Sequence, residues 1–229
     1  MDNRYYFEKQ EGNSIIIKNQ EATHLSKVRR ANIGDEIVAF CGDGLDYHAK
    51  ITTINKDKVT AEILSKSKNR AEAETQVLVY LASLKHEALT TAIDYLTEQN
   101  VKICKIFQAD RSVAEIDEKK LTKLKNISIQ ACKQCERASA MQIELIKKED
   151  IKRDAPKYKN VFFAYENADE NIKPFSGEFA VIIGPEGGFS EREVSYFSSF
   201  ASTISLGKTI LRAEVACASS ISALRAVRV

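Results

Sequence analysis

The segment AVIIGPEGGFSEREV, residues 180–194, joins an apolar run to a cluster of turn residues. Gly184 to Gly188 hold three glycines and one proline in five positions, although the whole chain has only nine glycines and three prolines. Such a turn can bring backbone close to a ligand. Ser190 followed by Glu193 forms a capping box, which predicts a helix from about Glu191. A strand, a glycine turn and a helix start in succession predict a ligand site, with a purely structural turn as the alternative.

The glycine spacing does not match the common phosphate-binding loops. G-x-x-G-G differs from the dinucleotide pattern G-x-G-x-x-G, and a phosphate loop ending at 207–209 would need a glycine where Ser202 stands. Pro185 also removes one backbone donor. The turn therefore suits a flat, uncharged part of a ligand, such as an adenosine, better than a phosphate.

A second loop, LGKTILRAE at 206–214, again follows a strand-like run and precedes a helical one. It places a cation, Arg212, two residues before a carboxylate, Glu214. Alone, this pair would be an ordinary surface salt bridge. Ligands of open α/β sheets lie beyond the carboxyl ends of the strands, so two such loops within about thirty residues predict one pocket.

The elements that must hold these loops fall into two regions. Residues 1–70 contain short runs of strand formers at 14–18, 35–41, 46–54 and 57–64, separated by turn residues, and are typical of a small antiparallel barrel. One short helix, with Thr23 as N-cap and Leu25 and Val28 three residues apart, interrupts them. The polar, unpatterned stretch 65–75 predicts a domain boundary at about residue 70.

Residues 71–229 alternate strands with helices. Apolar runs at 76–83, 101–108, 160–166, 178–184 and 203–207 predict strands, while 87–99, about 118–140 and the tail from Ala213 have helical character. This alternation predicts an α/β fold with a parallel sheet covered by helices on both sides.

Composition limits the class of protein. With 44% hydrophobic and 29% charged residues the chain is globular, and no apolar run reaches the roughly 20 residues of a membrane helix. The polar N-terminus has no apolar signal core, which predicts a cytoplasmic protein. Five cysteines fit a reducing compartment, and Cys132 and Cys135 form a lone C-x-x-C that indicates two small helix residues rather than a metal or redox site.

Charge is unevenly distributed although the net charge is only +2. Residues 119–160 hold twelve Lys or Arg against five Asp or Glu, and a second basic cluster comprises Lys27, Arg29 and Arg30. Either cluster could be a solvated face. Two of them in different parts of the chain favour an acidic polymer as partner.

The paired C-terminal motifs resemble a known family. I-G-P-E-G-G-F-S-x-x-E at 183–193 and L-G-x-x-I-L-R-x-E at 206–214 are similar to the signature of the ribosomal small-subunit RNA uracil-N3 methyltransferases of the SPOUT superfamily. H-L-x-x-V-x-R at 24–30 resembles that family's PUA-like barrel. Asp110-Arg111-Ser112 looks like its E-R-S motif, and Ala131, Gln134 and Arg137 look like its A-x-E-Q-x-x-R.

The resemblance implies a particular fold and cofactor. The expected fold is a SPOUT-type parallel sheet with a C-terminal trefoil knot at 71–229, preceded by a PUA-like RNA-binding barrel at 1–70. The expected cofactor is S-adenosylmethionine, no metal is expected, and a second subunit completes the active site, so a homodimer is implied. The residues expected to line the methyl donor are Ile183, Gly184, Pro185, Glu186, Gly187, Gly188, Leu206, Gly207, Ile210 and Leu211.

The implied reaction is methyl transfer to the imide nitrogen of a uracil in 16S rRNA, either in free RNA or in the small ribosomal subunit. Arg212 and Glu214 are expected beside the reacting groups or as a lock of the knot. The side chains expected to hold RNA are Arg4, Arg30, Arg111 and Arg137.

The chain departs from the family pattern at several positions. Ala213 and Val215 replace two threonines, Thr209 replaces an arginine and Lys133 replaces an acidic residue. No hydroxyl role can be transferred to positions 213 and 215. Two alternatives stay open: a SPOUT methyltransferase acting on another RNA, and an RNA-binding protein that has lost catalysis.

Overall fold

A computed structural model describes residues 4–72, 75–169 and 171–229. The chain forms two compact units. The N-terminal unit comprises residues up to 72 together with 129–140, and the C-terminal unit comprises 73–128 together with 141–229. Residues 1–3 of the polar N-terminus and 73–74 of the predicted linker lie outside the described residues, and the domain boundary at about 70 stays a prediction.

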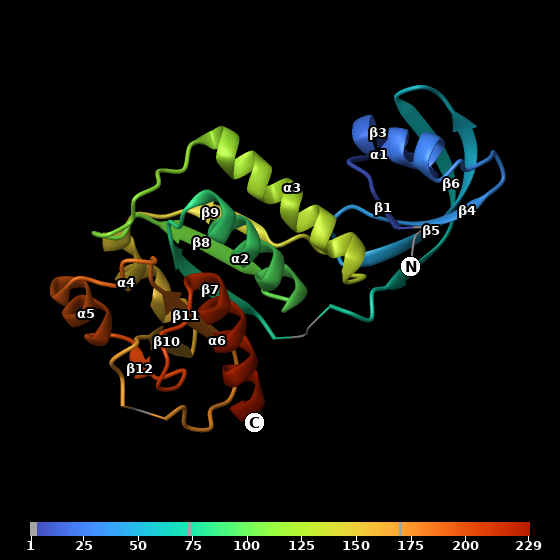
Figure 1. The fold of residues 1–229 in the computed structure, drawn as a ribbon. Helices are drawn as coiled ribbons and strands as arrows, with labels where there is room; N and C mark the ends of the chain where they lie inside the picture. Colours follow the sequence, from blue (N-terminus) through green and yellow to red (C-terminus); the bar gives the residue numbers. More distant parts are fainter. Residues whose placement is uncertain (1–3, 73–74, 170) are drawn as a thin grey trace. The chain divides into compact units, whose positions relative to one another are not determined.

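The N-terminal unit is built on a curled six-stranded sheet with the order β1-β4-β5-β6-β3-β2 (Figure 1). Its strands are β1 (Arg4–Tyr6), β2 (Lys9–Glu11), β3 (Ser14–Lys18), β4 (Glu36–Phe40), β5 (Leu45–Ile54) and β6 (Lys58–Lys68). In β5 the alternating residues Tyr47, Ala49 and Ile51 are buried, as expected for a strand with one face on a core. Strand β6 continues through 65–68, which we predicted as unpatterned, because β5 pairs with it as far as Lys68.

The short helix of this unit begins earlier than predicted. Helix α1 (Asn19–Thr23) follows Lys18 and continues into a π-helical turn, η1 (His24–Val28). Thr23 lies inside the helical segment and makes no cap hydrogen bond, so the predicted N-cap is wrong. The burial of apolar side chains explains where the helix lies in the chain, because Ala22 and Leu25 are both fully buried against the sheet.

The C-terminal unit contains the predicted parallel sheet. Its order is β12-β10-β11-β7-β8-β9, and every neighbouring pair is parallel. The strands are β7 (Val77–Ala82), β8 (Ile103–Phe107), β9 (Gln142–Leu145), β10 (Asn160–Ala164), β11 (Phe179–Ile183) and β12 (Ser202–Ile204). The sequence reading missed β9, since only Ile143 of its four residues is buried. The threading of the chain end through a knot stays a prediction.

Helices cover both faces of this sheet, as predicted (Figure 1). Helices α2 (His86–Glu98), α3 (Glu118–Gln134) and α6 (Ala213–Val227) contribute to the core on one face. Helices α4 (Ile151–Asp154) and α5 (Glu191–Ser198) contribute to the core on the other. Helix α3 ends at Gln134 rather than near 140. Glu136 has φ +62°, a left-handed conformation that stops a helix.

The strand order places the two loops of interest. Strand β10 lies between β11 and β12, and all three run in the same direction. The loops that follow β11 and β12 therefore leave the same edge of the sheet on either side of the end of β10. Among the described residues, no helix is long and apolar enough to cross a membrane.

A polar cluster under α4 ties this helix to the sheet. The Asp154 carboxylate, in a residue only 8% exposed, accepts hydrogen bonds from Tyr80 on β7 (2.9 Å) and Lys157 (2.6 Å), and pairs with Lys105 on β8. Burial alone would raise the pKa of Asp154. The hydrogen bonds from Lys105, Lys157 and Tyr80 outweigh that effect and lower the pKa from 3.8 to about 2.

We expect Asp154→Asn to lower the free energy of unfolding by about 2 kcal/mol at neutral pH, because the charged acceptor of this cluster is lost. The folded-state pKa lies below the unfolded-state value, so the contribution is present above pH 4 and is lost as the pH falls toward 2. Urea unfolding at several pH values measures it, and the difference between the two proteins should shrink from pH 5 to pH 3. A difference independent of pH would contradict this assignment.

The matched control is Asp150→Asn. Asp150 forms an exposed ion pair with Arg153 (3.0 Å), so its replacement should change the free energy of unfolding by less than about 0.5 kcal/mol.

Candidate functional site

A cavity of about 620 Å³ lies at the carboxyl ends of β10, β11 and β12. Three segments form most of its wall: residues 164–166 at the end of β10, 183–189 without Gly187 after β11, and 206–216 without Lys208 and Val215 after β12. Lys85 and Ala88 from the start of α2 complete it. Its volume falls in the range of roughly 300–1,000 Å³ that is usual for small-molecule sites. The two loops singled out from the sequence thus form one cavity.

The first loop needs its glycines for reasons of space and backbone conformation. Gly188 donates its N–H to the Pro185 carbonyl (2.9 Å) in a tight turn and has φ +67°. A Cβ on Gly184 would lie 2.6 Å from the Phe189 ring. That ring cannot move easily, because it packs edge-on against Phe163 and Phe197. The cavity wall at Gly184 is therefore bare backbone.

Glu186 links this loop to the start of α2 through a hydrogen bond. Its carboxylate accepts the backbone N–H of Lys85 (2.9 Å), the residue at the N-cap of α2. Negative charge is favourable at a helix N-terminus. This hydrogen bond joins the segment after β11 to the segment after β7. The acidic residue of the glycine turn therefore has a structural role.

The second loop leads directly into α6. Gly207 has φ +116°, and Ile210 is 87% exposed. Arg212 is the N-cap residue of α6 and makes no side-chain cap hydrogen bond, while Glu214 lies in the first helical turn. A carboxylate is favourable there, whereas a cation at the positive end of a helix is not. Arg212 is therefore not explained by the stability of α6.

Nearly all residues predicted for the donor site meet at this cavity. The lining includes Ile183, Gly184, Pro185, Glu186, Gly188, Leu206, Gly207, Ile210, Leu211, Arg212 and Glu214. Gly187 is not in the lining. A Cβ at that position would lie 3.2 Å from the Cβ of Arg111, so Gly187 is needed for close approach to a neighbouring loop.

The sequence reading missed the segment after β10. Ala164, Tyr165 and Glu166 line the cavity, and the Glu166 carboxylate approaches to 3.0 Å from where a Gly188 Cβ would stand. The predicted strand 160–166 ends in two polar residues, Tyr165 and Glu166, and polar residues at a strand end could have indicated a ligand site. The strand order was needed to show that this end lies between the two loops.

The four arginines predicted for RNA binding lie in different environments. In the C-terminal unit, Arg111 is exposed, and its Nη1 donates to the Gly187 carbonyl (3.0 Å). In the N-terminal unit, Arg30 is exposed just after η1, with φ +52°.

Arg4 and Arg137 are used within the N-terminal unit. Arg4 pairs with Asp46 (2.5 Å) and donates from Nη2 to the Arg137 carbonyl (2.9 Å), and Arg137 is only 1% exposed beside Glu72. The RNA contact of these two arginines stays a prediction, and their burial favours a structural role.

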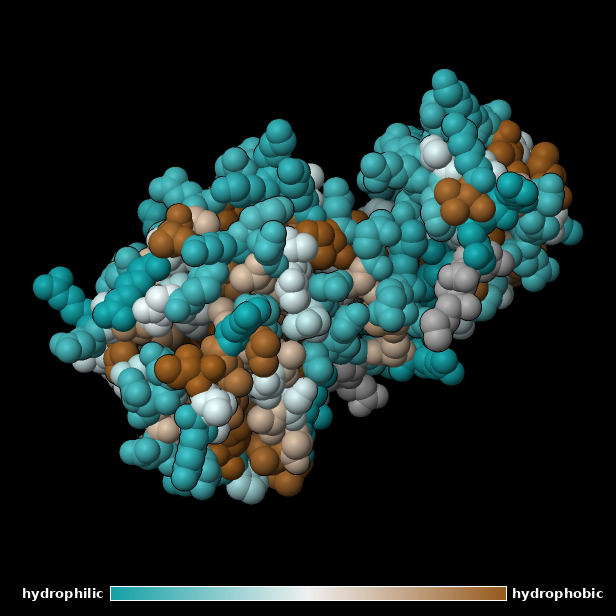
Figure 2. Space-filling model, viewed as in Figure 1, coloured by the Kyte–Doolittle hydropathy of each residue, from teal (hydrophilic) through white to brown (hydrophobic). Residues whose placement is uncertain are grey.

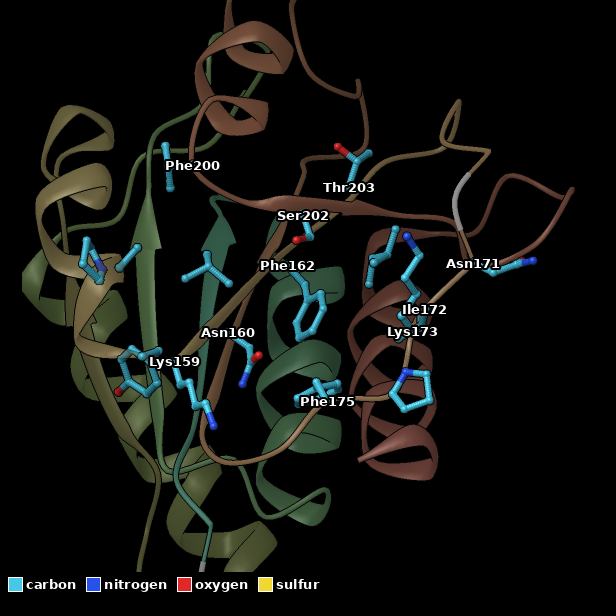
Figure 3. A pocket seen from close by; sticks show the side chains of 16 residues that line it. Lys159, Asn160, Phe162, Asn171, Ile172, Lys173, Phe175, Phe200, Ser202 and Thr203 are labelled. Atoms are coloured by element: carbon cyan, nitrogen blue, oxygen red, sulfur yellow. The ribbon is translucent and has the colours of Figure 1, made fainter. Parts of the chain in front are cut away.

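A second cavity, of about 650 Å³, lies in the C-terminal unit (Figure 3). Its lining includes Lys159 and Asn160 at the amino end of β10, the segment 171–175 and part of β12. The rings of Phe162 and Phe175 lie 4.8 Å apart in its wall. No residue of the glycine turn 184–188 or of the loop 205–212 lines it, so we take the first cavity as the candidate site.

Cys132, in the C-x-x-C pair, does not offer a reactive thiolate. Cys132 is buried, and burial raises the pKa of its thiol to about 12, so the thiol is protonated at neutral pH. All five cysteines are free thiols. Over residues 4–72, 75–169 and 171–229, no group of three or more His, Cys, Asp or Glu side chains could hold a metal ion.

Two family models match the two parts of the chain. A family described as "RNA methyltransferase domain" matches residues 71–225, and one described as "RNA methyltransferase PUA domain" matches 17–64. The chain is 26% identical to Ribosomal RNA small subunit methyltransferase E of Bacillus subtilis, covering 94% of this chain and 91% of the relative. It is 29% identical to the Helicobacter pylori protein of that name, covering 80% and 81%.

Solved structures are similar over nearly the whole chain. A Legionella pneumophila protein described as a methyltransferase in complex with the bound cofactor SAM has 27% identity and a TM-score of 0.87, covering 99% of this chain and 98% of that chain. Ribosomal RNA small subunit methyltransferase E of Neisseria gonorrhoeae shares the fold, with 22% identity and a TM-score of 0.88. Since the RNA methyltransferase domain alone spans more than half of the sequence, the chain belongs to the RNA methyltransferase family, with an N-terminal PUA domain.

Proposed function

We propose that this protein is an S-adenosylmethionine-dependent methyltransferase of small-subunit ribosomal RNA that modifies the imide nitrogen N3 of a uracil in 16S rRNA. The observation that carries the proposal is the cavity that both glycine loops form at the carboxyl ends of β10, β11 and β12. The named function of the relatives and the cofactor bound in the Legionella protein support it.

The cavity fits the cofactor in chemistry as well as in size. Apolar side chains, including Ile183, Leu206 and Ala216, suit an adenine ring. Glu166 provides negative charge for a ligand that carries a sulfonium and an ammonium group. The bare backbone at Gly184 allows close approach, and Ile183 to Gly188 without Gly187 form one side of the site.

The residues of the second loop are proposed to act on the RNA. The cofactor supplies an activated methyl group when bound, so the protein must position the uracil and help to remove its imide proton. We assign Arg212 to stabilise the negative charge that develops on the uracil as this proton leaves. We assign Glu214, half-buried in the first turn of α6, to accept the proton directly or through water.

Mass mapping of methylated nucleotides tests this reaction. In a strain that lacks the gene, one uracil of 16S rRNA should lose a base methyl group, and the added enzyme with S-adenosylmethionine should restore it. Glu214→Gln should lower the rate by about 10²- to 10⁴-fold while calorimetry shows an unchanged cofactor affinity. A methyl group on a ribose or on another RNA would replace the N3 assignment, and a wild-type protein without cofactor affinity would exclude an enzyme.

RNA binding by the N-terminal unit is proposed to involve Arg30. This side chain is exposed, and Lys27 and Arg29 beside it are exposed as well. Exposed cations can neutralise phosphates, and each one adds about one unit to the salt dependence of binding.

We expect Arg30→Ala to weaken binding to 16S rRNA and to reduce the slope of log K against log salt by about 1, with unchanged affinity for the cofactor. Filter binding at several salt concentrations measures the slope. Lys9→Ala is the control, because Lys9 is exposed in the same unit but paired with Glu11. An equal effect of both substitutions would mean that Arg30 makes no specific contact.

A homodimer is proposed from the outer face of α6. Val215 (40% exposed), Ala218, Ser219, Ser222 and Ala226 recur at helical spacing and carry no charge. Figure 2 shows white and brown residues gathered over α6, whereas most of the same face is teal. A small, uncharged helix face beside the exposed Ile210 is suited to packing against a second copy, next to the cavity.

Sedimentation equilibrium should accordingly show a dimer for the wild type and a monomer for Ser222→Glu, because the carboxylate would be buried without a partner. Thr122→Glu on the exposed face of α3 is the control and should leave the dimer intact. A wild-type protein that is monomeric at micromolar concentration would contradict this interface.

A further inference from the structure

One buried carboxylate joins the loop after β8 to the loop that carries the glycine turn. Glu193, on α5, is only 2% exposed. Its Oε2 accepts the Ser190 N–H (3.0 Å), which completes the capping box of α5. Its Oε1 accepts the N–H of Asp110 (2.9 Å), 83 residues earlier in the chain. The Glu193 side chain, which caps α5, therefore also holds the Asp110-Arg111-Ser112 loop.

Lys148 closes this network from a third segment. It lies at the start of the 3₁₀ turn η2 (Lys148–Asp150), and its Nζ donates to Glu193 Oε1 (3.0 Å) and pairs with Asp110. Ser190 Oγ donates to the second oxygen of Asp110 (2.5 Å). The hydrogen bonds from Lys148 and Ser190 hold the pKa of Asp110 below its usual value, so this carboxylate is ionised at neutral pH.

The network orients Arg111 onto the glycine turn. With Asp110 held on one side, the Arg111 guanidinium donates to the Gly187 carbonyl (3.0 Å). Gly184, Glu186 and Gly188 of the same turn line the candidate cofactor cavity. The turn therefore has the cavity on one side and an exposed arginine on the other. An arginine has five N–H donors, so one contact with Gly187 leaves enough of them to bind a phosphate.

We propose that Asp110, Lys148 and Glu193 are positioning residues that couple RNA binding at Arg111 to occupancy of the cofactor cavity. The proposal rests on the function proposed above. The Arg111 contact with Gly187 and the cavity wall at Gly184, Glu186 and Gly188 involve the same conformation of one turn. Two ligands that favour one state of a shared element must strengthen each other's binding by the same factor.

The test measures that factor directly. We would determine the dissociation constant of 16S rRNA with and without saturating S-adenosylhomocysteine, which prevents turnover, and the constant of S-adenosylhomocysteine with and without the RNA. The wild type should show at least about fivefold tighter binding of each ligand in the presence of the other. Asp110→Asn should reduce this factor toward 1 while the affinity for S-adenosylhomocysteine alone changes less than about threefold.

The control is Asp150→Asn, which removes a nearby carboxylate paired with Arg153 outside the network and should leave the factor unchanged. Arg111→Lys keeps the charge but not the planar donor group, and should lose most of the coupling. A purely structural role would change stability or both affinities without changing the factor.

Two outcomes would overturn the proposal: a factor of 1 in the wild type when both ligands bind, or an unchanged factor in Asp110→Asn. Neither outcome affects the proposed function. A wild-type protein that binds no S-adenosylhomocysteine and no S-adenosylmethionine would instead refute the proposed function, and the coupling with it.

Discussion

The position of β10 between β11 and β12 is the constraint on which the candidate site depends. Parallel neighbours lie about 4.8 Å apart, so the loops after β11 and β12 leave the sheet roughly 10 Å from each other, with the end of β10 between them. That separation suits one small ligand between two loops.

Local steric contacts explain the glycines of the turn after β11. Gly184 faces the Phe189 ring, Gly187 faces Arg111 and Gly188 has a left-handed conformation near Glu166. Each glycine therefore has a separate physical reason. Glu186, the one charged residue of the turn, is held by the hydrogen bond that its carboxylate accepts from the Lys85 backbone N–H at the start of α2.

Buried polar groups fix the parts of the C-terminal unit relative to each other. Asp154 joins α4 to the sheet through Tyr80 and Lys105, and Glu193 joins α5 to the loop after β8. Buried carboxylates are costly unless they are paired and hydrogen-bonded, so each specifies a single arrangement of the segments that contact it. In an RNA methyltransferase this rigidity serves a reaction that depends on positioning two reactants.

Elements with local signals could be predicted from the amino-acid sequence. The capping box of Ser190 and Glu193, the parallel sheet and helix α6 from Ala213 are all present, because hydrophobic period and cap chemistry act over a few residues. The paired motifs at 183–193 and 206–214 also identified most of the cavity lining. Signals near a chain reversal were less reliable, as the early start of α1 and the end of α3 at Gln134 show.

The residues that share the site from distant parts of the chain could not be predicted, because long-range contacts bring them together. Tyr165 and Glu166 enter it because β10 lies between β11 and β12, and no spacing in the sequence encodes that order. Long-range contacts also set the exposure of the predicted arginines. Arg137 is buried in the N-terminal unit, while Arg111 is exposed beside the glycine turn. Residue type determines what chemistry a side chain can do, but burial and partners, which depend on long-range contacts, determine whether it is available.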